Sequence, residues 1–253
     1  PDAIAEIEFF ANAEDTQLLL QLYLAESTPR VRLREVSEAL VEMLPETAGV
    51  TSLRVEPTAH APGSEALAQT VHGAGELVYK TAQGEYRVSA GAFFQVNRYL
   101  TDELVKIVIA GPSGGTALDL YAGVGLFAVP LARNFERVVA VESSQISHSD
   151  LQYNSPGNVQ AVHATTEQHL QSFRDTPDLV VVDPPRGGLG EAVAQALGRL
   201  QAPRLTYVSC DPATLARDLR LLTTAGYAIE QAHLVDLFPQ TFHLESVLQL
   251  VKR

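Results

Sequence analysis

The sequence predicts an α/β protein with a mostly parallel, seven-stranded sheet, preceded by a smaller α+β region. From Thr116 onward, short apolar runs alternate with helical patterns along most of the chain. Such alternation is typical of a parallel sheet that is covered by helices on both faces. Residues before about 98 lack it, so we expect a small α+β domain over residues 1–98 and a larger domain over residues 99–253.

In the larger domain, each of the first five predicted strands is followed by a helical pattern. The strands are expected at Ala117–Tyr121, Val138–Val141, Val159–Val162, Leu179–Val182 and Leu205–Val208, and the helices at Leu126–Arg133, Ser144–Tyr153, Thr165–Phe173, Glu191–Leu200 and Ala213–Thr223. Two further runs, Tyr227–Leu237 and Ser246–Val251, leave no room for a helix between them. They should therefore pair antiparallel, which brings the sheet to seven strands.

The smaller domain has fewer clear signals. We expect strands at Ala3–Ala11, Val50–Val55, Leu77–Thr81 and Tyr86–Ser89, a helix at Val31–Leu44, a hairpin turn at Gln83-Gly84 and a loop at Thr58–Gly63. The chain begins at Pro1 and its sole methionine is Met43, which favours a processed or truncated N-terminus.

Composition narrows the function classes. The formal net charge of −12 argues against a broad electrostatic grip on nucleic acid, because phosphate binding draws its affinity from Lys and Arg. No segment has the apolar length of a membrane span, and no charged-then-apolar leader opens the sequence. We expect a cytoplasmic protein, without a membrane partner, that is a monomer.

A glycine-containing turn follows the first strand of the larger domain. Asp119–Ala128 contains Gly123 and Gly125, and Glu142 closes the next strand nineteen positions after Gly123. Glycines allow a ligand to approach the backbone closely, and an acidic side chain at the second strand can accept hydrogen bonds from ribose hydroxyls. The turn alone does not distinguish a nicotinamide cofactor from S-adenosylmethionine.

Reactive groups follow two later strands. Asp183-Pro184-Pro185-Arg186 follows one buried strand, and Ser209-Cys210-Asp211-Pro212 follows the next. Open α/β sheets bind ligands at this carboxyl edge. Cys210 is the only cysteine, so it cannot form an internal disulfide, and a reactive thiol competes with a small buried hydrophobe as its interpretation. The histidines have no metal-ligand spacing, and we expect no metal site.

In these motifs the chain resembles the uracil-5 RNA methyltransferases, which use S-adenosylmethionine to form 5-methyluridine in tRNA or ribosomal RNA. The resemblance covers roughly Gly91 to Arg253. It rests on five motifs in the family's order: Phe93-Phe94-Gln95-Val96-Asn97, the Asp119–Ala128 turn, Asp183-Pro184-Pro185-Arg186, the run Ser209–Asp218 and the run Phe238–Ser246. It implies a Rossmann-like class I methyltransferase domain.

The resemblance also implies roles for individual residues. Cys210 would be the nucleophile and Glu245 the base that removes the carbon-5 proton. The residues expected around the cofactor or the target base are Gln95, Tyr121, Gly123, Glu142 and Asp183, with Phe93 a candidate to pack on the uracil.

The chain departs from the family pattern in three respects. Many members have a cysteine and a polar residue in the glycine turn, where this chain has Ala122 and Leu126. The single cysteine rules out the iron–sulfur cluster that some members hold on four cysteines. No segment indicates the N-terminal RNA-binding barrel that is common in the family, so target choice stays open.

Other interpretations remain. An Asp-Pro-Pro turn also suits a methyltransferase acting on an exocyclic amine, which needs no cysteine, and the glycine turn alone suits a nicotinamide oxidoreductase. A non-catalytic RNA-binding or folding module is the alternative outside enzymes. His243 is as well explained by a core position as by catalysis, and Arg186 and Arg217 either contact phosphate or make ordinary salt bridges.

Overall fold

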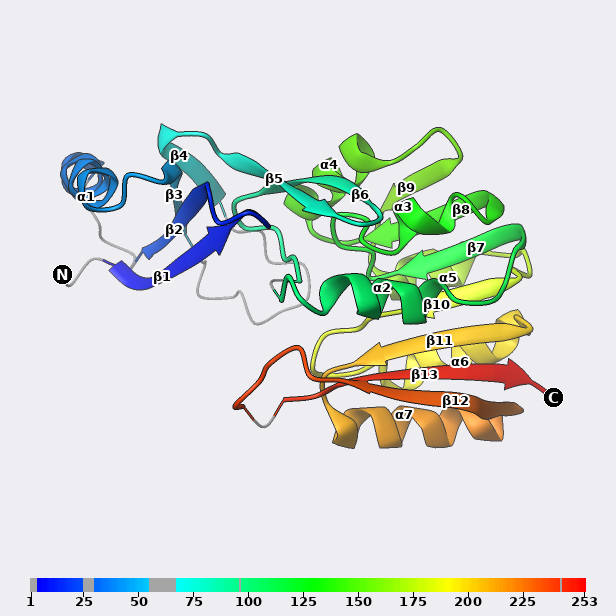
Figure 1. The fold of residues 1–253 in the computed structure, drawn as a ribbon. Helices are drawn as coiled ribbons and strands as arrows, with labels where there is room; N and C mark the ends of the chain where they lie inside the picture. Colours follow the sequence, from blue (N-terminus) through cyan, green and yellow to red (C-terminus); the bar gives the residue numbers. More distant parts are fainter. Residues whose placement is uncertain (1–3, 25–29, 55–66, 96, 242) are drawn as a thin grey trace.

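A computed structural model describes residues 4–24, 30–54, 67–95, 97–241 and 243–253. Its larger sheet has seven strands in the order β12-β13-β11-β10-β7-β8-β9 (Figure 1). Strand β13 runs antiparallel to both of its neighbours, β11 and β12, and the other pairs are parallel, which confirms the predicted pairing of the last two strands. The strands are β7 (Gly114–Leu120), β8 (Phe135–Glu142), β9 (Val159–His163), β10 (Leu179–Val182), β11 (Arg204–Ser209), β12 (Tyr227–Val235) and β13 (Glu245–Lys252).

Helices cover both faces of this sheet, as predicted. Neighbouring residues on β7 enter different clusters, because successive side chains of a strand point to opposite faces. Ala117 packs with α2 (Thr101–Ile109), α3 (Ala128–Leu131) and α4 (Gln145–Asn154). Leu118 packs with α5 (Thr166–Ser172), α6 (Gly190–Leu200) and α7 (Pro212–Thr224).

Two helices differ from the prediction. The helix expected at Leu126–Arg133 is only the four-residue α3, because Gly123 and Gly125 adopt positive φ and the preceding residues form turns. Helix α2 was not predicted. Its β-branched residues are weak helix formers, and burial of Leu104, Val105 and Val108 against the sheet stabilises it instead.

The N-terminal part contains a four-stranded sheet in the order β1-β2-β3-β4. Its elements are β1 (Ile4–Ala11), β2 (Leu18–Leu24), α1 (Arg30–Met43), β3 (Thr47–Arg54) and β4 (Leu67–Gly73). The sequence prediction missed β2 and β4. In β2, Leu19 and Leu20 are both fully buried, so the strand lacks the alternation that marks a half-buried strand. The loop predicted at Thr58–Gly63 lies outside the described residues.

A two-stranded hairpin, β5 (Glu76–Thr81) and β6 (Gly84–Ser89), forms a separate sheet that packs against α4 rather than joining the N-terminal sheet. Arg87 Nε donates to Asp150 Oδ1 on α4 at 2.6 Å, and Ser89 N donates to Asp150 Oδ2 at 2.7 Å. The predicted turn is present at Ala82–Gln83, with Gly84 as the first residue of β6. The domain boundary at residues 98 and 99 stays a prediction.

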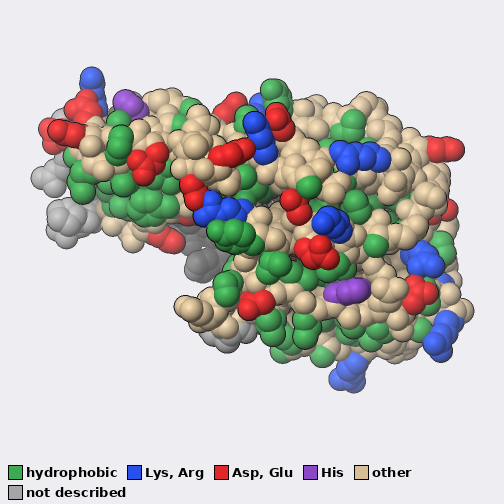
Figure 2. Space-filling model, in the orientation of Figure 1, with side chains coloured by type: hydrophobic (Ala, Val, Ile, Leu, Met, Phe, Trp, Pro, Cys, Tyr) green, Lys and Arg blue, Asp and Glu red, His purple; other side chains and the backbone are tan. Residues whose placement is uncertain are grey.

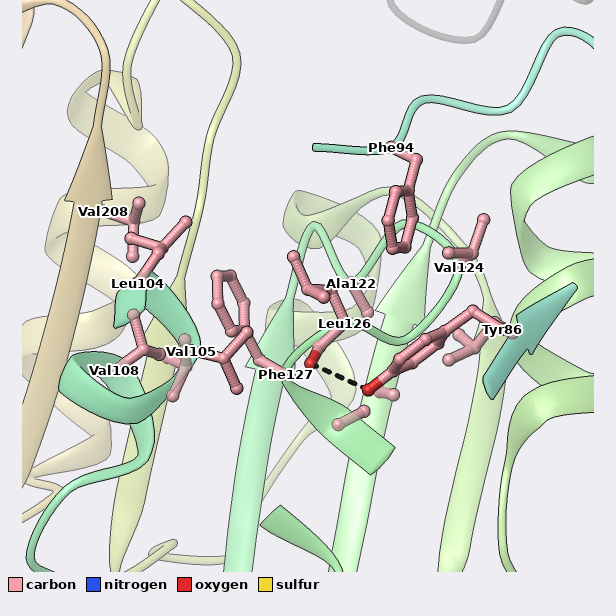
Figure 3. Close-up of a cluster of buried hydrophobic side chains, with 14 of the residues drawn as sticks. Tyr86, Phe94, Leu104, Val105, Val108, Ala122, Val124, Leu126, Phe127 and Val208 are labelled. Carbon is pink, nitrogen blue, oxygen red and sulfur yellow. Dashed lines mark hydrogen bonds between the residues drawn. The ribbon is translucent and has the colours of Figure 1, made fainter. Parts of the chain in front are cut away.

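The hairpin of β5 and β6 also packs against the glycine turn. Tyr86 is fully buried and its hydroxyl donates to Leu126 O at 3.4 Å (Figure 3). Phe94, Val124 and Phe127 fill the space around this contact. The turn therefore rests on a continuous hydrophobic core.

None of the helices in the described ranges combines the length and the apolar character that a membrane span requires.

Candidate active site

The predicted nucleophile and base lie opposite each other at the carboxyl edge of the sheet. Ser209, the last residue of β11, pairs with Ser246 in the antiparallel β11–β13 ladder, so Cys210, which directly follows the strand, comes level with Glu245. Asp183 follows the adjacent parallel strand β10. In Figure 1 this edge faces the side of the molecule where β1–β4 lie.

The Cys210 thiol is partly buried directly before α7. Burial raises its pKa above the ordinary value, and the carboxyl groups of Glu245 and Asp183 raise it further. The Arg186 guanidinium opposes this rise, and a helix N-terminus also favours a thiolate. Asp211 caps α7 by accepting from Ala213 N and Thr214 N at 2.9 and 2.8 Å, which fixes the backbone beside the thiol.

Glu245 is 2 % exposed, and burial raises its pKa to about 7. Burial also raises the pKa of Asp183, with further increases from the negative charges of Glu245 and Asp119. A carboxyl group with a pKa near neutrality can both accept and release a proton at physiological pH. This edge of the sheet thus holds a thiol, a carboxyl group suited to proton transfer and a second carboxyl group that favours its protonated form.

Glu142, the last residue of β8, fixes the backbone of the glycine turn through hydrogen bonds. Its Oε2 accepts from Gly123 N at 2.9 Å and its Oε1 from Ser144 N at 2.7 Å. A carboxylate has about four acceptor positions, so capacity remains for a ligand's hydroxyl groups. Tyr121 begins the turn with a φ of 63°, and around Gly123 the nearest atom to an added Cβ would be Phe93 O at 4.0 Å.

Asp119 is a candidate site residue that the sequence analysis did not assign. It is fully buried near the carboxyl end of β7, and neither carboxyl oxygen has a hydrogen-bond partner among the described residues. Burial raises its pKa to about 8; the nearby backbone N–H of Ala128 opposes this rise, and the charge of Glu142 adds to it. The signal in the sequence was an acidic residue inside an otherwise apolar strand, where an unpaired carboxylate is costly.

The loop with Gln95 lies against the glycine turn. Gln95 is 6 % exposed and Phe93 is 69 % exposed. The loop is fixed at one end by Gly91 N, which donates to Gln21 Oε1 on β2 at 2.5 Å. At the other end Asn97 Nδ2 donates to Leu237 O at 2.8 Å, beyond β12. Contacts from β2 and from the segment after β12 therefore position it.

Arg186 and Arg217 have different environments. Arg186 is exposed, and its Nη2 lies 3.1 Å from His243 Nε2. Arg217 is also exposed, but its guanidinium donates hydrogen bonds to Asp218 and to Gly187 O. This geometry supports the salt-bridge interpretation for Arg217 and leaves Arg186 accessible to a ligand. No group of acidic, histidine or cysteine side chains in the described part of the chain could hold a metal ion.

The chain is similar in sequence to known proteins. A family model described as tRNA (Uracil-5-)-methyltransferase matches residues 65–253. An uncharacterized RNA methyltransferase of Thermotoga maritima is 36% identical over 191 residues, which cover 73% of this chain and 44% of that protein. Another from Streptococcus pyogenes serotype M3 is 30% identical over 244 residues, covering 92% of this chain and 53% of that protein. The chain thus spans about half the length of these relatives.

Solved structures agree on the fold. The tRNA (uracil-54, C5)-methyltransferase of Pyrococcus abyssi, crystallised with S-adenosyl-L-homocysteine, has a TM-score of 0.77 at 23% identity. The match covers 98% of this chain and 60% of that one. The aTrm5 protein in complex with tRNALeu has a TM-score of 0.63 at 12% identity, covering 99% of this chain and 73% of that one. At these identities the likeness establishes the fold alone.

Proposed function

Because the chain belongs to the tRNA (uracil-5-)-methyltransferase family, we propose that it transfers a methyl group from S-adenosylmethionine to carbon 5 of a uridine in tRNA or ribosomal RNA. The observation that carries this proposal is that Cys210, directly after the last β11–β13 pair of Ser209 and Ser246, comes level with Glu245 and is acted on by its charge. Mass spectrometry of RNA after incubation with the protein and labelled S-adenosylmethionine tests it. A labelled 5-methyluridine supports the proposal, and label in an exocyclic amine contradicts it.

The residues at the carboxyl ends of β7 and β8 suit the binding of S-adenosylmethionine. The carboxylate of Glu142 can accept hydrogen bonds from ribose hydroxyls while it holds Gly123 N. The open surface at Gly123 admits a ligand close to the backbone. Tyr121 adjoins this surface, and Asp183 and Gln95 lie on the flanking loops. When bound, S-adenosylmethionine supplies an electrophilic methyl group on a sulfonium.

Cys210 supplies the activation that the uracil needs. Carbon 5 of uracil is a weak nucleophile, but addition of the Cys210 thiolate at carbon 6 converts the ring into an enolate. Carbon 5 then attacks the methyl group, so one difficult step is divided into easier ones. Attack at carbon 6 comes from above the ring plane, so the target base must leave its stack to reach the thiol. The exposed ring of Phe93 is available to pack on it.

Glu245 completes the reaction. After methyl transfer, carbon 5 carries both a methyl group and a proton. Removal of that proton by the Glu245 carboxylate re-forms the carbon 5–carbon 6 double bond and expels the Cys210 thiolate. The pKa of about 7 makes Glu245 a stronger base than an exposed glutamate, and a substantial fraction is ionised at neutral pH.

Replacing Glu142 with Ala is expected to weaken S-adenosylmethionine binding by about 1–3 kcal/mol, the range for the loss of a hydrogen bond to a charged group. Isothermal titration calorimetry measures the effect. Glu136→Ala is the matched control, because Glu136 is exposed on the same strand. Equal affinity of Glu142→Ala and the wild type would remove Glu142 from the site.

RNA binding by the chain on its own is expected to be weak and steeply dependent on salt. The net charge is −12, and on the face seen in Figure 2 the basic side chains are scattered among acidic ones. Affinity that arises from phosphate contacts falls as salt rises, because bound counterions are released. Fluorescence anisotropy with a labelled RNA hairpin over a salt series measures both quantities. Tight binding at physiological salt would contradict this expectation.

A further inference from the structure

The loop between Asp183 and α6 is fastened to helix α7 at its far end. Arg217 Nη2 donates to Gly187 O at 2.7 Å, and Leu189 N donates to Asp218 Oδ2 at 2.6 Å. Arg217 and Asp218 are consecutive residues of α7. Two contacts, one on either side of Gly188, therefore attach the loop to the helix that begins two residues after Cys210.

Asp218 is itself rigidly held. Its carboxylate is fully buried, and burial of a charge is costly unless hydrogen bonds compensate it. The Tyr207 hydroxyl donates to Oδ2 at 2.8 Å, and Arg217 Nε donates to Oδ1 at 2.9 Å. Tyr207 is a buried residue of β11, three positions before Cys210. One carboxylate thus connects the loop, α7 and the strand that ends at the thiol.

The approach of the loop to this carboxylate requires glycine at position 188. Gly188 has a φ of 73°, in the left-handed region that favours glycine. A Cβ at this position would lie 2.4 Å from Asp218 Oδ2 and 2.7 Å from Arg217 Nη2. The absence of a side chain allows the loop backbone to reach Arg217 and Asp218 directly.

Between Asp183 and this attachment, the loop presents Arg186 to the active site. Pro184 and Pro185 restrict the backbone before Arg186, and Gly188 N donates to Pro185 O at 2.8 Å, which closes a turn around it. The Arg186 side chain reaches His243 and acts electrostatically on both Cys210 and Asp211. In the described part of the chain, Arg186 is the cation that opposes the effect of the acidic Glu245 and Asp183 on the thiol.

We propose that Arg217 and Asp218 are positioning residues, which hold the loop at residues 187–189 against α7 and thereby keep Arg186 beside Cys210. Arg186 favours the thiolate over the thiol, and the thiolate is the species that adds to carbon 6. Loosening the attachment leaves the cofactor site at Glu142 intact but lowers the reactivity of Cys210. The kinetic part of this proposal rests on the proposed function, whereas the thiol reactivity does not.

The test compares Arg217→Gln, Arg186→Gln, the double variant and Arg220→Gln in the full chain. Arg220 is an exposed arginine on the same helix and serves as the matched control. Because Cys210 is the only cysteine, iodoacetamide alkylation followed by intact-protein mass spectrometry reports its reactivity alone. Thermal melting and S-adenosylmethionine affinity show whether each variant is folded and keeps the cofactor site.

Arg217→Gln and Arg186→Gln are each expected to slow alkylation at neutral pH by about threefold or more, where tenfold corresponds to one unit of Cys210 pKa. The double variant should be no slower than Arg186→Gln alone, because both changes act through the same guanidinium. Methyl transfer should lose kcat by about 10- to 100-fold in Arg217→Gln, since small displacements of reacting groups have effects of this size. The KM for S-adenosylmethionine should stay unchanged.

Three results would overturn the proposal. The first is that Cys210 in Arg217→Gln is alkylated at the wild-type rate. The second is that the double variant is slowed by the product of the two single effects. The third is an equal loss in Arg220→Gln. If the wild type forms no 5-methyluridine, the proposed function fails, but the alkylation series still decides whether Arg217 positions Arg186.

Discussion

RNA with 5-fluorouridine at the target position is expected to become covalently attached to the wild-type protein, and not to Cys210→Ala. Addition of the thiolate and transfer of the methyl group proceed on the fluorinated ring, but fluorine at carbon 5 cannot leave as a proton. The adduct should therefore persist with the transferred methyl group on it. On ordinary RNA, Cys210→Ala should show no detectable turnover, because loss of a covalent nucleophile can lower kcat by about 10⁶-fold.

A denaturing gel with labelled RNA and a labelled methyl donor measures this outcome. Cys210→Ser is the informative companion variant, because it keeps a small polar side chain but lacks the acidity of a thiol. An adduct with Cys210→Ala would move the nucleophile to another residue. Full methylation by Cys210→Ala would favour the exocyclic-amine methyltransferase, and an intact wild-type protein that forms neither adduct nor product would favour a non-catalytic RNA-binding module.

Replacing Glu245 with Gln should have the opposite effect on the adduct. The amide is nearly isosteric but cannot accept the carbon-5 proton, so the thiol cannot leave. A covalent protein–RNA adduct should accumulate on ordinary uridine, and product formation should fall by about 10²- to 10⁴-fold, the range for loss of a general base. Glu191→Gln, at an exposed glutamate near the start of α6, is the control.

The pH dependence of the elimination step provides a second readout of Glu245. The carboxylate is the active form and burial raises its pKa to about 7, so adduct decay in the wild type should accelerate as pH rises through about 7. Rapid-quench measurement of adduct decay isolates this step, because the thiol has already reacted. Fast turnover by Glu245→Gln without an adduct would require another base, and His243, which adjoins Arg186, would be the next residue to replace.

Local patterns were sufficient to predict the larger sheet. The alternation of apolar runs and helical patterns determined its strand count, and the short segment between β12 and β13 determined the antiparallel pair. The N-terminal part was harder to predict. Strand β2 is buried on both faces, so its sequence lacks the alternation of apolar and polar residues that marks a half-buried strand. Helix α2 was missed for a related reason, since tertiary packing rather than propensity stabilises it.

The sequence by itself determined the family of this protein: a glycine turn, an Asp-Pro-Pro-Arg turn, a lone cysteine and Glu245 occur in the order of one family. Only the tertiary structure decided which of these groups act on one another. Antiparallel pairing brings Glu245 level with Cys210, and burial raises the pKa of Glu245 to about 7. The tertiary structure also decided that Arg217 donates hydrogen bonds to Asp218 and Gly187, whereas Arg186 lies beside His243. The reason is physical, because burial and proximity across sheet strands depend on long-range pairing, which neither composition nor local spacing encodes.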